Sequence, residues 1–154
     1  MQKTGRKIVA RNKRARFDYE LLEQFEAGLV LWGTEIKSIR ANQVSLQRSF
    51  VRPLKDELWL IDANIAPYEH GNRENHEPTR ARKLLLHRRE INRIIDQLQQ
   101  KSLTIVPTQM YLKNGRAKLE IALARGKRKQ DKRTDLAKKD AQRQVERALR
   151  EKFR

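Results

Sequence analysis

The sequence LTIVPTQMYLKNGRAKLEIALAR (residues 103–125) contains two strand-like runs that meet at Asn114-Gly115. In the second run, Ala117, Leu119, Ile121 and Leu123 occupy alternate positions, with the charged residues Lys118 and Glu120 between the first three. An Asn-Gly pair between two such runs is the strongest short-range signal for a β-hairpin, because both residues tolerate positive φ. Period-two alternation also predicts that each strand buries one face. This stretch therefore predicts an antiparallel hairpin at the centre of a β-structure.

Other parts of the chain predict further strands. DYELLEQFEAGLVLW (residues 18–32) is apolar at its odd positions, with one exception, which is typical of a long half-buried strand. Gly28 inside it suggests a bulge or a sharp bend, as the corner of a barrel requires. SFVRPL (residues 49–54) and ELWLIDANI (residues 57–65) have the composition of two more strands, joined by a two-residue turn. In total we expect about five or six antiparallel strands.

Two helical segments accompany the strands. HRREINRIIDQLQQK (residues 87–101) places aliphatic residues at helical spacing, and TEIKSIR (residues 34–40) predicts a short helical turn. PYEHGNRENHEPTRARK (residues 67–83) is polar and rich in turn formers, so we expect an exposed loop. The predicted fold class is mainly β: a small OB-like antiparallel barrel with one main capping helix, a short helical turn and a basic C-terminal tail.

Charge divides the chain into three parts. Residues 1–16 carry seven basic and no acidic residues, and residues 125–154 carry thirteen basic and five acidic ones, out of a total net charge of +17. Residues 17–124 are nearly neutral, with sixteen basic and fourteen acidic residues. We therefore expect a basic N-terminal arm (1–16), a barrel (17–125) and a basic tail (126–154). The tail has too little apolar surface to fold alone, so we expect it to be disordered in the free protein.

The composition also disfavours several classes of function. The chain has no apolar run near the ~20 residues of a membrane-spanning helix, so no membrane partner is expected. It has no cysteine, which fits a cytoplasmic protein. Its three histidines, His70, His76 and His87, lack the spacing of a metal site and are expected at the surface. No nucleophile elbow or phosphate-binding loop is present. We therefore expect no enzyme activity, no cofactor and no metal.

The basic segments instead favour RNA. The run PTRARKLLLHRRE (residues 78–90) gathers Arg80, Arg82 and other cations around three leucines. Such cations contact phosphates and give affinity without sequence specificity. Aromatic residues make up only 6% of the chain, too few for a general platform that stacks single-stranded bases. Recognition of a folded RNA by its shape is more consistent with this composition.

Three segments together resemble one family. NKRARFDYELLEQFEAGLVLWGTEIKSIRA (residues 12–41), NHEPTRARKLLLHRREI (residues 75–91) and YLKNGRAKLEIALARGK (residues 111–127), with DKR following at residues 131–133, resemble the small protein B family of SsrA-binding (tmRNA-binding) proteins. The resemblance covers the chain from about Asn12 to Arg133. It implies an OB-like barrel without enzyme activity that binds the tRNA-like domain of tmRNA and promotes its delivery to stalled ribosomes in trans-translation.

The same resemblance implies partners and a role for the tail. The partners would be tmRNA, the small ribosomal subunit with its 16S rRNA, and elongation factor Tu with GTP through alanyl-tmRNA. The tail would enter the decoding centre and the empty mRNA channel, where it would become helical. The tail positions that the resemblance singles out are Gly126, Lys127, Gln130, Asp131, Lys132, Arg133 and Leu149. Gln130 stands where the family usually has Tyr or His, and Ala137 where it often has Lys.

The barrel positions that match the family's RNA contacts are Asn12, Lys13, Arg14, Glu26, Glu35, Lys37, Ser38, Arg40, Lys83, Leu85, His87 and Lys118. Strand alternation predicts that Glu26 and Lys118 point outward. Three of these positions have an alternative interpretation: Leu85 could be a core residue, and Glu35 and Lys37 could pair or cap locally. An acidic contact such as Glu26 would accept a hydrogen bond from a base edge, a ribose hydroxyl or an arginine that it orients.

A structural rRNA-binding protein of the ribosome is the alternative function. Such a protein would share the basic ends and the small barrel. The two functions differ in stoichiometry, because a ribosomal component is present in every subunit whereas a rescue factor follows tmRNA.

Overall fold

The fold is known from a computed structural model that describes residues 5–70, 75–127 and 129–152. The predicted hairpin is confirmed. Strands β8 (Thr104–Lys113) and β9 (Arg116–Gly126) pair in antiparallel register, from Lys113 opposite Arg116 to Thr104 opposite Ala124. The turn uses positive φ at both residues, 52° at Asn114 and 77° at Gly115, as a type I′ turn requires.

This hairpin lies inside a seven-stranded antiparallel sheet in the described part of the chain, with the order β1-β8-β9-β2-β7-β5-β4. The remaining strands of the sheet are β1 (Arg6–Arg11), β2 (Tyr19–Leu29), β4 (Phe50–Leu54), β5 (Glu57–Ile61) and β7 (Arg82–Leu85). A small second sheet pairs β3 (Val44–Ser45) with β6 (Asn64–Ile65). The mainly β prediction is confirmed, and the sheet has more strands than expected.

The extra strand comes from the basic N-terminal segment. Residues Arg6–Arg11 form an edge strand that pairs with β8, so this part of the predicted arm belongs to the sheet. Apolar and polar residues alternate only weakly in this strand, because four of its six residues are basic or alanine. The periodicity of the sequence therefore did not predict a strand there. The chain then turns into α1 (Lys13–Asp18), which sequence analysis also did not predict.

Helix α1 covers one end of the sheet's outer side. Ala15 of α1 is buried against Val106 of β8 and the small residues Ala122 and Ala124 of β9. The two alanines allow the helix to approach the strand closely. Beyond them, the outer side of β9 presents Lys118 and Glu120, which are half-buried. The helix therefore determines which part of this sheet face remains accessible.

Strand β2 changes partners at Gly28, which is paired with both Lys118 of β9 and Leu85 of β7. A Cβ at Gly28 would lie 3.4 Å from the Cβ of Leu85, at the lower limit of ordinary van der Waals contact, so β2 and β7 pack closely at this position. The bulge expected at this glycine lies elsewhere, because the register of β2 shifts between Leu21 and Glu23.

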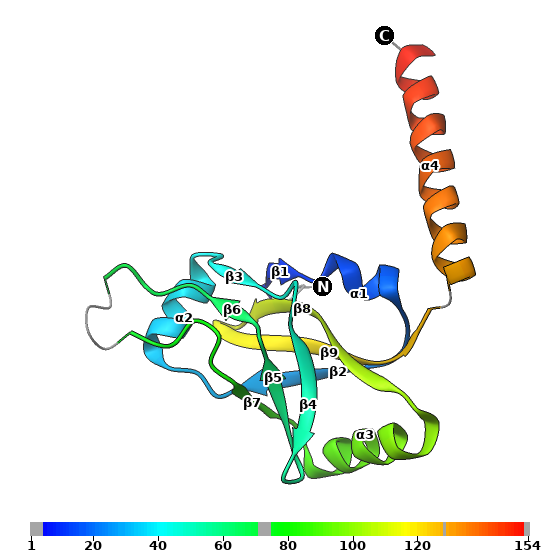
Figure 1. Cartoon of the computed structure of the whole chain (residues 1–154). Coiled ribbons are helices and arrows are strands. Elements are labelled where there is room, and N and C mark those ends of the chain that lie inside the picture. The colour runs from blue at the N-terminus through cyan, green and yellow to red at the C-terminus, as the bar shows by residue number, and fades with distance from the viewer. Residues whose placement is uncertain (1–4, 71–74, 128, 153–154) are drawn as a thin grey trace.

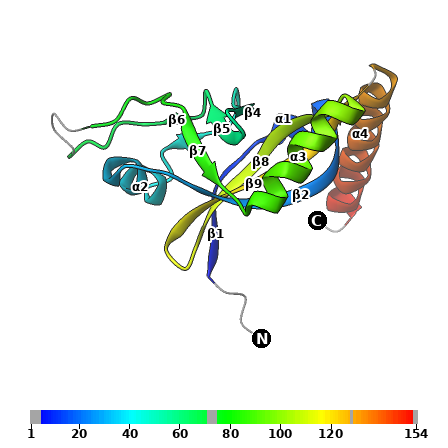
Figure 2. The same cartoon turned by 90° about the horizontal axis from the view of Figure 1, so that it is seen from below.

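The sheet curls, and its edge strand β4 comes into contact with β8 (Figure 1). The enclosed core is built from the inner faces of the strands, with Leu58, Leu60, Leu84 and Leu119 fully buried. Helix α3 (Arg88–Lys101) caps this core with Ile91 and Ile94, as its helical spacing predicted. Figure 2 shows α2 (Gly33–Arg40) and α3 on opposite sides of the sheet's centre, with α4 (Lys129–Lys152) beyond α3.

The segment between β6 and β7 is less exposed than expected. His76 is buried, with its Nδ1 2.9 Å from Thr34 Oγ1 and its Nε2 2.7 Å from the carbonyl oxygen of Ile65. Arg82 is fully buried and donates through Nε to Glu35 at 2.7 Å. The predictions of a surface histidine at 76 and of a phosphate-binding arginine at 82 are therefore wrong. Both side chains tie the loop to α2 and to the core.

Helix α4 (Lys129–Lys152) follows β9 and extends away from the barrel (Figure 1). At 24 residues it is about 36 Å long, at ~1.5 Å per residue. Every side chain described from Leu136 to Arg150 is exposed. Across the described ranges of the chain, no helix is both long and apolar enough to span a membrane.

Candidate nucleic-acid interface

Three of the predicted RNA contacts share the outer face of the sheet, which we define as the side of β9, β2 and β7 opposite the core. Gly28 of β2 is opposite both Lys118 and Leu85, and directly opposed residues in antiparallel strands point to the same side. Glu26 lies two residues before Gly28 and therefore points the same way. Three strands that are distant in sequence thus bring Glu26, Leu85 and Lys118 to one surface.

Glu26 is held by two neighbours on this face. The hydroxyl of Tyr111 donates a hydrogen bond to Glu26 Oε2. The Nζ of Lys113 lies 3.5 Å from Glu26 Oε1. Tyr111 is itself opposite Lys118 in the β8–β9 register, and the guanidinium of Arg6 covers its ring at 3.8 Å from the centroid. Strand β1 therefore contributes to the outer face through Arg6.

These contacts set the ionisation of both residues. The hydrogen bond from Tyr111, helped by the charge of Lys113, holds the pKa of Glu26 below its usual value and outweighs its partial burial. Burial and the hydrogen bond to Glu26 together raise the pKa of Tyr111 to about 12. At neutral pH the pair is thus a carboxylate and a neutral phenol. The exposed carboxylate can still accept hydrogen bonds from outside, since each oxygen has two lone pairs.

Leu85 is a surface residue, 50% exposed. The interpretation of Leu85 as a core residue is therefore wrong. Its neighbour Leu84 is fully buried, because side chains alternate along β7. Lys83, two residues before Leu85, is half-buried and opposite Trp59 of β5. His87 is exposed and precedes the first residue of α3.

Of the four predicted contacts on helix α2, two are exposed and two are buried. Lys37 and Arg40 are exposed, and Arg40 reaches toward the β8–β9 turn, 3.4 Å from the carbonyl oxygen of Gly115. Glu35 and Ser38 are buried. Ser38 donates to the carbonyl oxygen of Ala66 at 2.7 Å. Both side chains are thus used inside the protein in this structure, and their contact with RNA stays a prediction.

The local alternative for Glu35 is the correct one. Its Oε1 accepts from the Trp32 N–H at 2.8 Å and from Arg80 at 2.5 Å, while Oε2 accepts from Arg82. Burial alone would raise the pKa of Glu35, but these hydrogen bonds from Arg80, Trp32 and Arg82 outweigh it and leave the pKa lowered. Burial lowers the pKa of Arg82, against the effect of the Glu35 charge. Glu35 thus caps α2 and anchors the start of β7.

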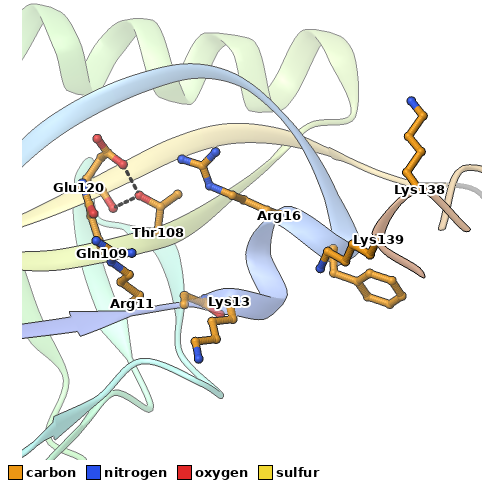
Figure 3. A pocket seen from close by; sticks show the side chains of 10 residues that line it. Arg11, Lys13, Arg16, Thr108, Gln109, Glu120, Lys138 and Lys139 are labelled. Carbon is orange, nitrogen blue, oxygen red and sulfur yellow. Dashed lines mark hydrogen bonds between the residues drawn. The ribbon is translucent and has the colours of Figure 1, made fainter. Parts of the chain in front are cut away.

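A second basic surface lies where β1, α1 and α4 meet (Figure 3). A cavity of about 740 Å³ is lined by five basic side chains, which are Arg11, Lys13, Arg16, Lys138 and Lys139. Glu120 also lines it and accepts a hydrogen bond from Thr108 Oγ1 at 2.5 Å. We call this cavity the α1 groove. The excess of positive charge suits a phosphate backbone.

The three predicted N-terminal contacts near this groove differ in their exposure to solvent. Lys13 and Arg14 are exposed, whereas Asn12 is buried. Asn12 donates through Nδ2 to the carbonyl oxygen of Pro107 at 2.9 Å, and its backbone N–H donates to Thr108 at 2.8 Å. Asn12 therefore joins β1 to β8 where α1 begins, and a contact of its side chain with RNA stays a prediction.

The tail positions start at the end of the sheet. Gly126 is the last residue of β9, opposite Tyr19. The backbone N–H of Lys127 donates to Asp18, and its Nζ donates to the carbonyl oxygen of Arg16 at 2.8 Å. Arg133 and Leu149 are exposed on α4. The helix includes Gln130, Asp131 and Lys132, whose side chains lie outside the described part of the structure.

Sequence analysis missed Tyr111, Lys113 and Arg6, which surround Glu26. Tyr111 belongs to a strand that is apolar on both faces, so its alternation did not identify an outer face. The available signal was the hairpin register, because a turn at Asn114-Gly115 places Tyr111 opposite Lys118. Arg6 could not be found without the pairing of β1 with β8.

Comparisons with known proteins agree on one family. The family described as SmpB protein matches residues 9–151. An SsrA-binding protein of Shouchella clausii (strain KSM-K16) is 57% identical over 98% of this chain and 97% of its own length. That of Halalkalibacterium halodurans is 56% identical over the full length of both chains.

A solved structure gives the same result. A chain from a study described as "tmRNA-SmpB: a journey to the center of the bacterial ribosome" is 48% identical, with a TM-score of 0.64 over 80% of this chain and 90% of that chain. Identity at this level across most of the chain, together with the shared fold, shows common descent. This chain belongs to the SmpB family of SsrA-binding proteins.

Proposed function

We propose that this protein binds tmRNA, the SsrA RNA, and acts in trans-translation. The barrel recognises the tRNA-like domain of tmRNA through its outer face. The protein then promotes delivery of tmRNA to stalled ribosomes. It works by binding, as an RNA-binding protein without enzyme activity, and it needs no cofactor.

The convergence of Glu26, Leu85 and Lys118 on one exposed face is the observation that carries this proposal. The three side chains offer an acceptor, an apolar contact and a cation. A folded RNA presents complementary groups, namely ribose hydroxyls, an unstacked base and phosphates. The matches to SsrA-binding proteins along nearly the whole chain support the same RNA as the ligand.

We further propose that α4 enters the decoding centre and the empty mRNA channel of the small ribosomal subunit. Its exposed apolar residues Leu136, Val145 and Leu149 receive little support from the barrel, so the helix is expected to be marginal in the free protein. The negative phosphates of 16S rRNA would stabilise its many cations. Ordering on binding costs free energy that these contacts must offset.

Two partner proposals complete this function. Elongation factor Tu with GTP associates through alanyl-tmRNA, and the ribosome is the site of action, which makes the protein cytoplasmic. A structural rRNA-binding protein is the weaker alternative, because the similar proteins are named for binding SsrA rather than as ribosomal components.

The experiment uses the full chain and a version that ends at Gly126. Each is titrated against the tRNA-like fragment of tmRNA and against ordinary tRNA at ~0.15 M salt, where non-specific charge is largely screened. Peptide tagging on stalled ribosomes is measured in parallel.

The proposal expects both proteins to prefer the tmRNA fragment and only the full chain to support tagging. If neither protein prefers the fragment to tRNA, the proposed function is wrong. If the shortened protein supports full tagging, the role of α4 is wrong while recognition by the barrel is retained.

A further inference from the structure

The outer face continues beyond Glu26, Leu85 and Lys118. After β2 ends at Leu29, the N–H of Val30 still donates to the carbonyl oxygen of Lys83 at 3.0 Å, so the pairing with β7 extends by one residue. Val30 therefore lies beside Lys83 on the same side as Leu85. Trp32 follows two residues later in extended backbone, with φ −82° and ψ 161°. The row Gly28, Val30, Trp32 thus prolongs the outer face toward α2.

Trp32 is a large aromatic residue at the surface. Half of its side chain is exposed, and Val30 beside it is 44% exposed. Its backbone N–H is used by Glu35, and its carbonyl oxygen accepts from the N–H groups of Glu35 and Ile36. The backbone of Trp32 therefore has a defined role at the start of α2, and this role does not explain why an indole side chain is exposed here.

The indole ring is also held in position. The guanidinium of Arg80 lies over it, 5.5 Å from the ring centroid. Arg80 is fixed in turn by Glu35 at 2.5 Å and by the carbonyl oxygen of Val30 at 3.1 Å. A buried carboxylate thus anchors the arginine that supports the ring. A ring fixed in this way loses little conformational entropy when a flat ligand stacks on it.

We propose that Trp32 stacks on an unpaired nucleobase of the RNA that the outer face binds, and that it extends this interface past Leu85 and Val30. The inference rests on the proposed function. Base–aromatic stacking tolerates any base, because every base has a π-face. Trp32 therefore adds affinity and fixes the position of the RNA without reading a sequence.

The charged side chains beside Gly28, Val30 and Trp32 favour RNA over an apolar protein segment as the binding partner. Lys83, Arg80 and Lys118 accompany the three apolar side chains. The nearby acids are already engaged: Glu35 is buried between two arginines, Glu26 is bound by Tyr111 and Lys113, and Glu120 accepts a hydrogen bond from Thr108. An aromatic surface among cations is the composition that binds a base together with its phosphates.

The test compares Trp32→Ala and Trp32→Phe with Phe50→Ala, which removes an aromatic side chain of similar exposure from edge strand β4. Each full-length variant is titrated with the tRNA-like fragment of tmRNA over a range of salt concentrations. Trp32→Ala is expected to weaken binding roughly 5- to 150-fold, the range of one stacked base, and to leave the salt dependence unchanged. Trp32→Phe should retain most of the affinity, and Phe50→Ala should bind like the parent protein.

A spectroscopic measurement distinguishes stacking from an effect on folding. The chain has two tryptophans, so Trp59→Phe leaves Trp32 as the single indole. Its fluorescence should be quenched on addition of the tmRNA fragment, at the same midpoint as binding. Thermal unfolding of each variant verifies that the barrel is intact.

The outcomes separate the two proposals. If the parent protein prefers tmRNA but Trp32→Ala binds equally well, or the fluorescence of Trp32 does not change, stacking is refuted and the proposed function stands. If Trp32→Ala loses affinity with a reduced salt slope, the effect is electrostatic and stacking is again refuted. A parent protein that does not prefer tmRNA to tRNA overturns both.

Discussion

The hydroxyl of Tyr111 donates a hydrogen bond to the carboxylate of Glu26, although 85 positions separate the two residues in the chain. The sheet order brings β8, β9 and β2 together and makes this contact possible. Arg6 covers the tyrosine ring from β1. The carboxylate on the outer face is therefore positioned by residues of β8 and β1, and several measurable consequences follow from that.

The first prediction concerns Tyr111 as a positioning residue. Tyr111→Phe keeps the ring under Arg6 and removes only the hydroxyl. We expect a loss in tmRNA affinity of about 1 kcal/mol, or ~5-fold, because Glu26 is no longer oriented. In a double-mutant cycle with Glu26→Gln the two losses should not add, since both act through one contact. Tyr19→Phe, which removes a hydroxyl near α1, serves as the control. Additive losses would show that Tyr111 acts independently of Glu26.

The second prediction is that the stabilising contribution of Tyr111 is lost at high pH. Because the pKa of Tyr111 is raised to about 12 in the folded protein, its stabilising contribution is fully present below the unfolded value near pH ~10 and is lost as the pH rises through the folded value. The contribution of this pKa shift to the free energy of unfolding is at most on the order of 3 kcal/mol. The difference in the free energy of unfolding between the parent and Tyr111→Phe should shrink between pH 10 and 12. A difference in the free energy of unfolding that stays constant over this pH range would contradict the raised pKa of Tyr111.

The third prediction concerns the buried pair of Glu35 and Arg82. Arg82→Met leaves Glu35 with one fewer partner inside the protein, and we expect a loss of roughly 3–5 kcal/mol in the free energy of unfolding, measured with urea. Arg88→Met breaks the more exposed ion pair with Glu57 and should cost at most about 1 kcal/mol. Equal losses in the two variants would mean that burial of the pair has no special effect.

The same pair gives a prediction at low pH. The pKa of Glu35 is lowered in the folded protein, so its contribution is present above the ordinary value of 4.5 and is lost as the pH falls through the folded value. The parent protein should lose stability over that interval more steeply than Glu35→Gln. Parallel pH profiles for the two proteins would contradict the lowered pKa.

The fifth prediction concerns helix α4. Removal of residues 127–154 should lower the melting temperature of the barrel only slightly. It removes the hydrogen bonds of Lys127 to Asp18 and Arg16, but the described side chains from Leu136 to Arg150 are exposed. The difference in far-ultraviolet circular dichroism between the two proteins should be smaller than a 24-residue helix would give, since such a helix is marginal without packing. A full helical difference in the free protein would contradict the proposed ordering on the ribosome.

Local signals in the sequence were sufficient for the hairpin and for α3. Asn114-Gly115 determines its turn by backbone preference alone, and the spacing of Ile91 and Ile94 determines the buried face of α3. The outward direction of Glu26 follows from strand alternation in the same way. These features depend on residues that are close together in the chain.

The features that the sequence did not reveal depend on distant partners. Arg82 and His76 have the composition of an exposed loop, and only Glu35, Thr34 and the carbonyl oxygen of Ile65 explain why they are buried. Leu85 shows the opposite case. It belongs to an apolar run, yet its own side chain faces solvent. No local pattern separates it from Leu84 until the register of β7 with β2 is known.

The central claim is that the outer face recognises tmRNA. The most direct measurement is the ratio of dissociation constants for ordinary tRNA and for the tRNA-like fragment at ~0.15 M salt. It is made for the parent, for a triple variant with Glu26→Gln, Leu85→Ala and Lys118→Ala, and for a control triple variant. The control makes chemically matched changes at the β4–β5 hairpin, which are Asp56→Asn, Leu54→Ala and Arg52→Ala.

We predict that the parent and the control bind the tmRNA fragment at least about tenfold more tightly than tRNA, which corresponds to ~1.4 kcal/mol. The outer-face variant should lose this preference while its non-specific affinity, supported by the α1 groove and α4, largely remains. A preference that survives in the outer-face variant, or that the control loses equally, would contradict recognition by the outer face.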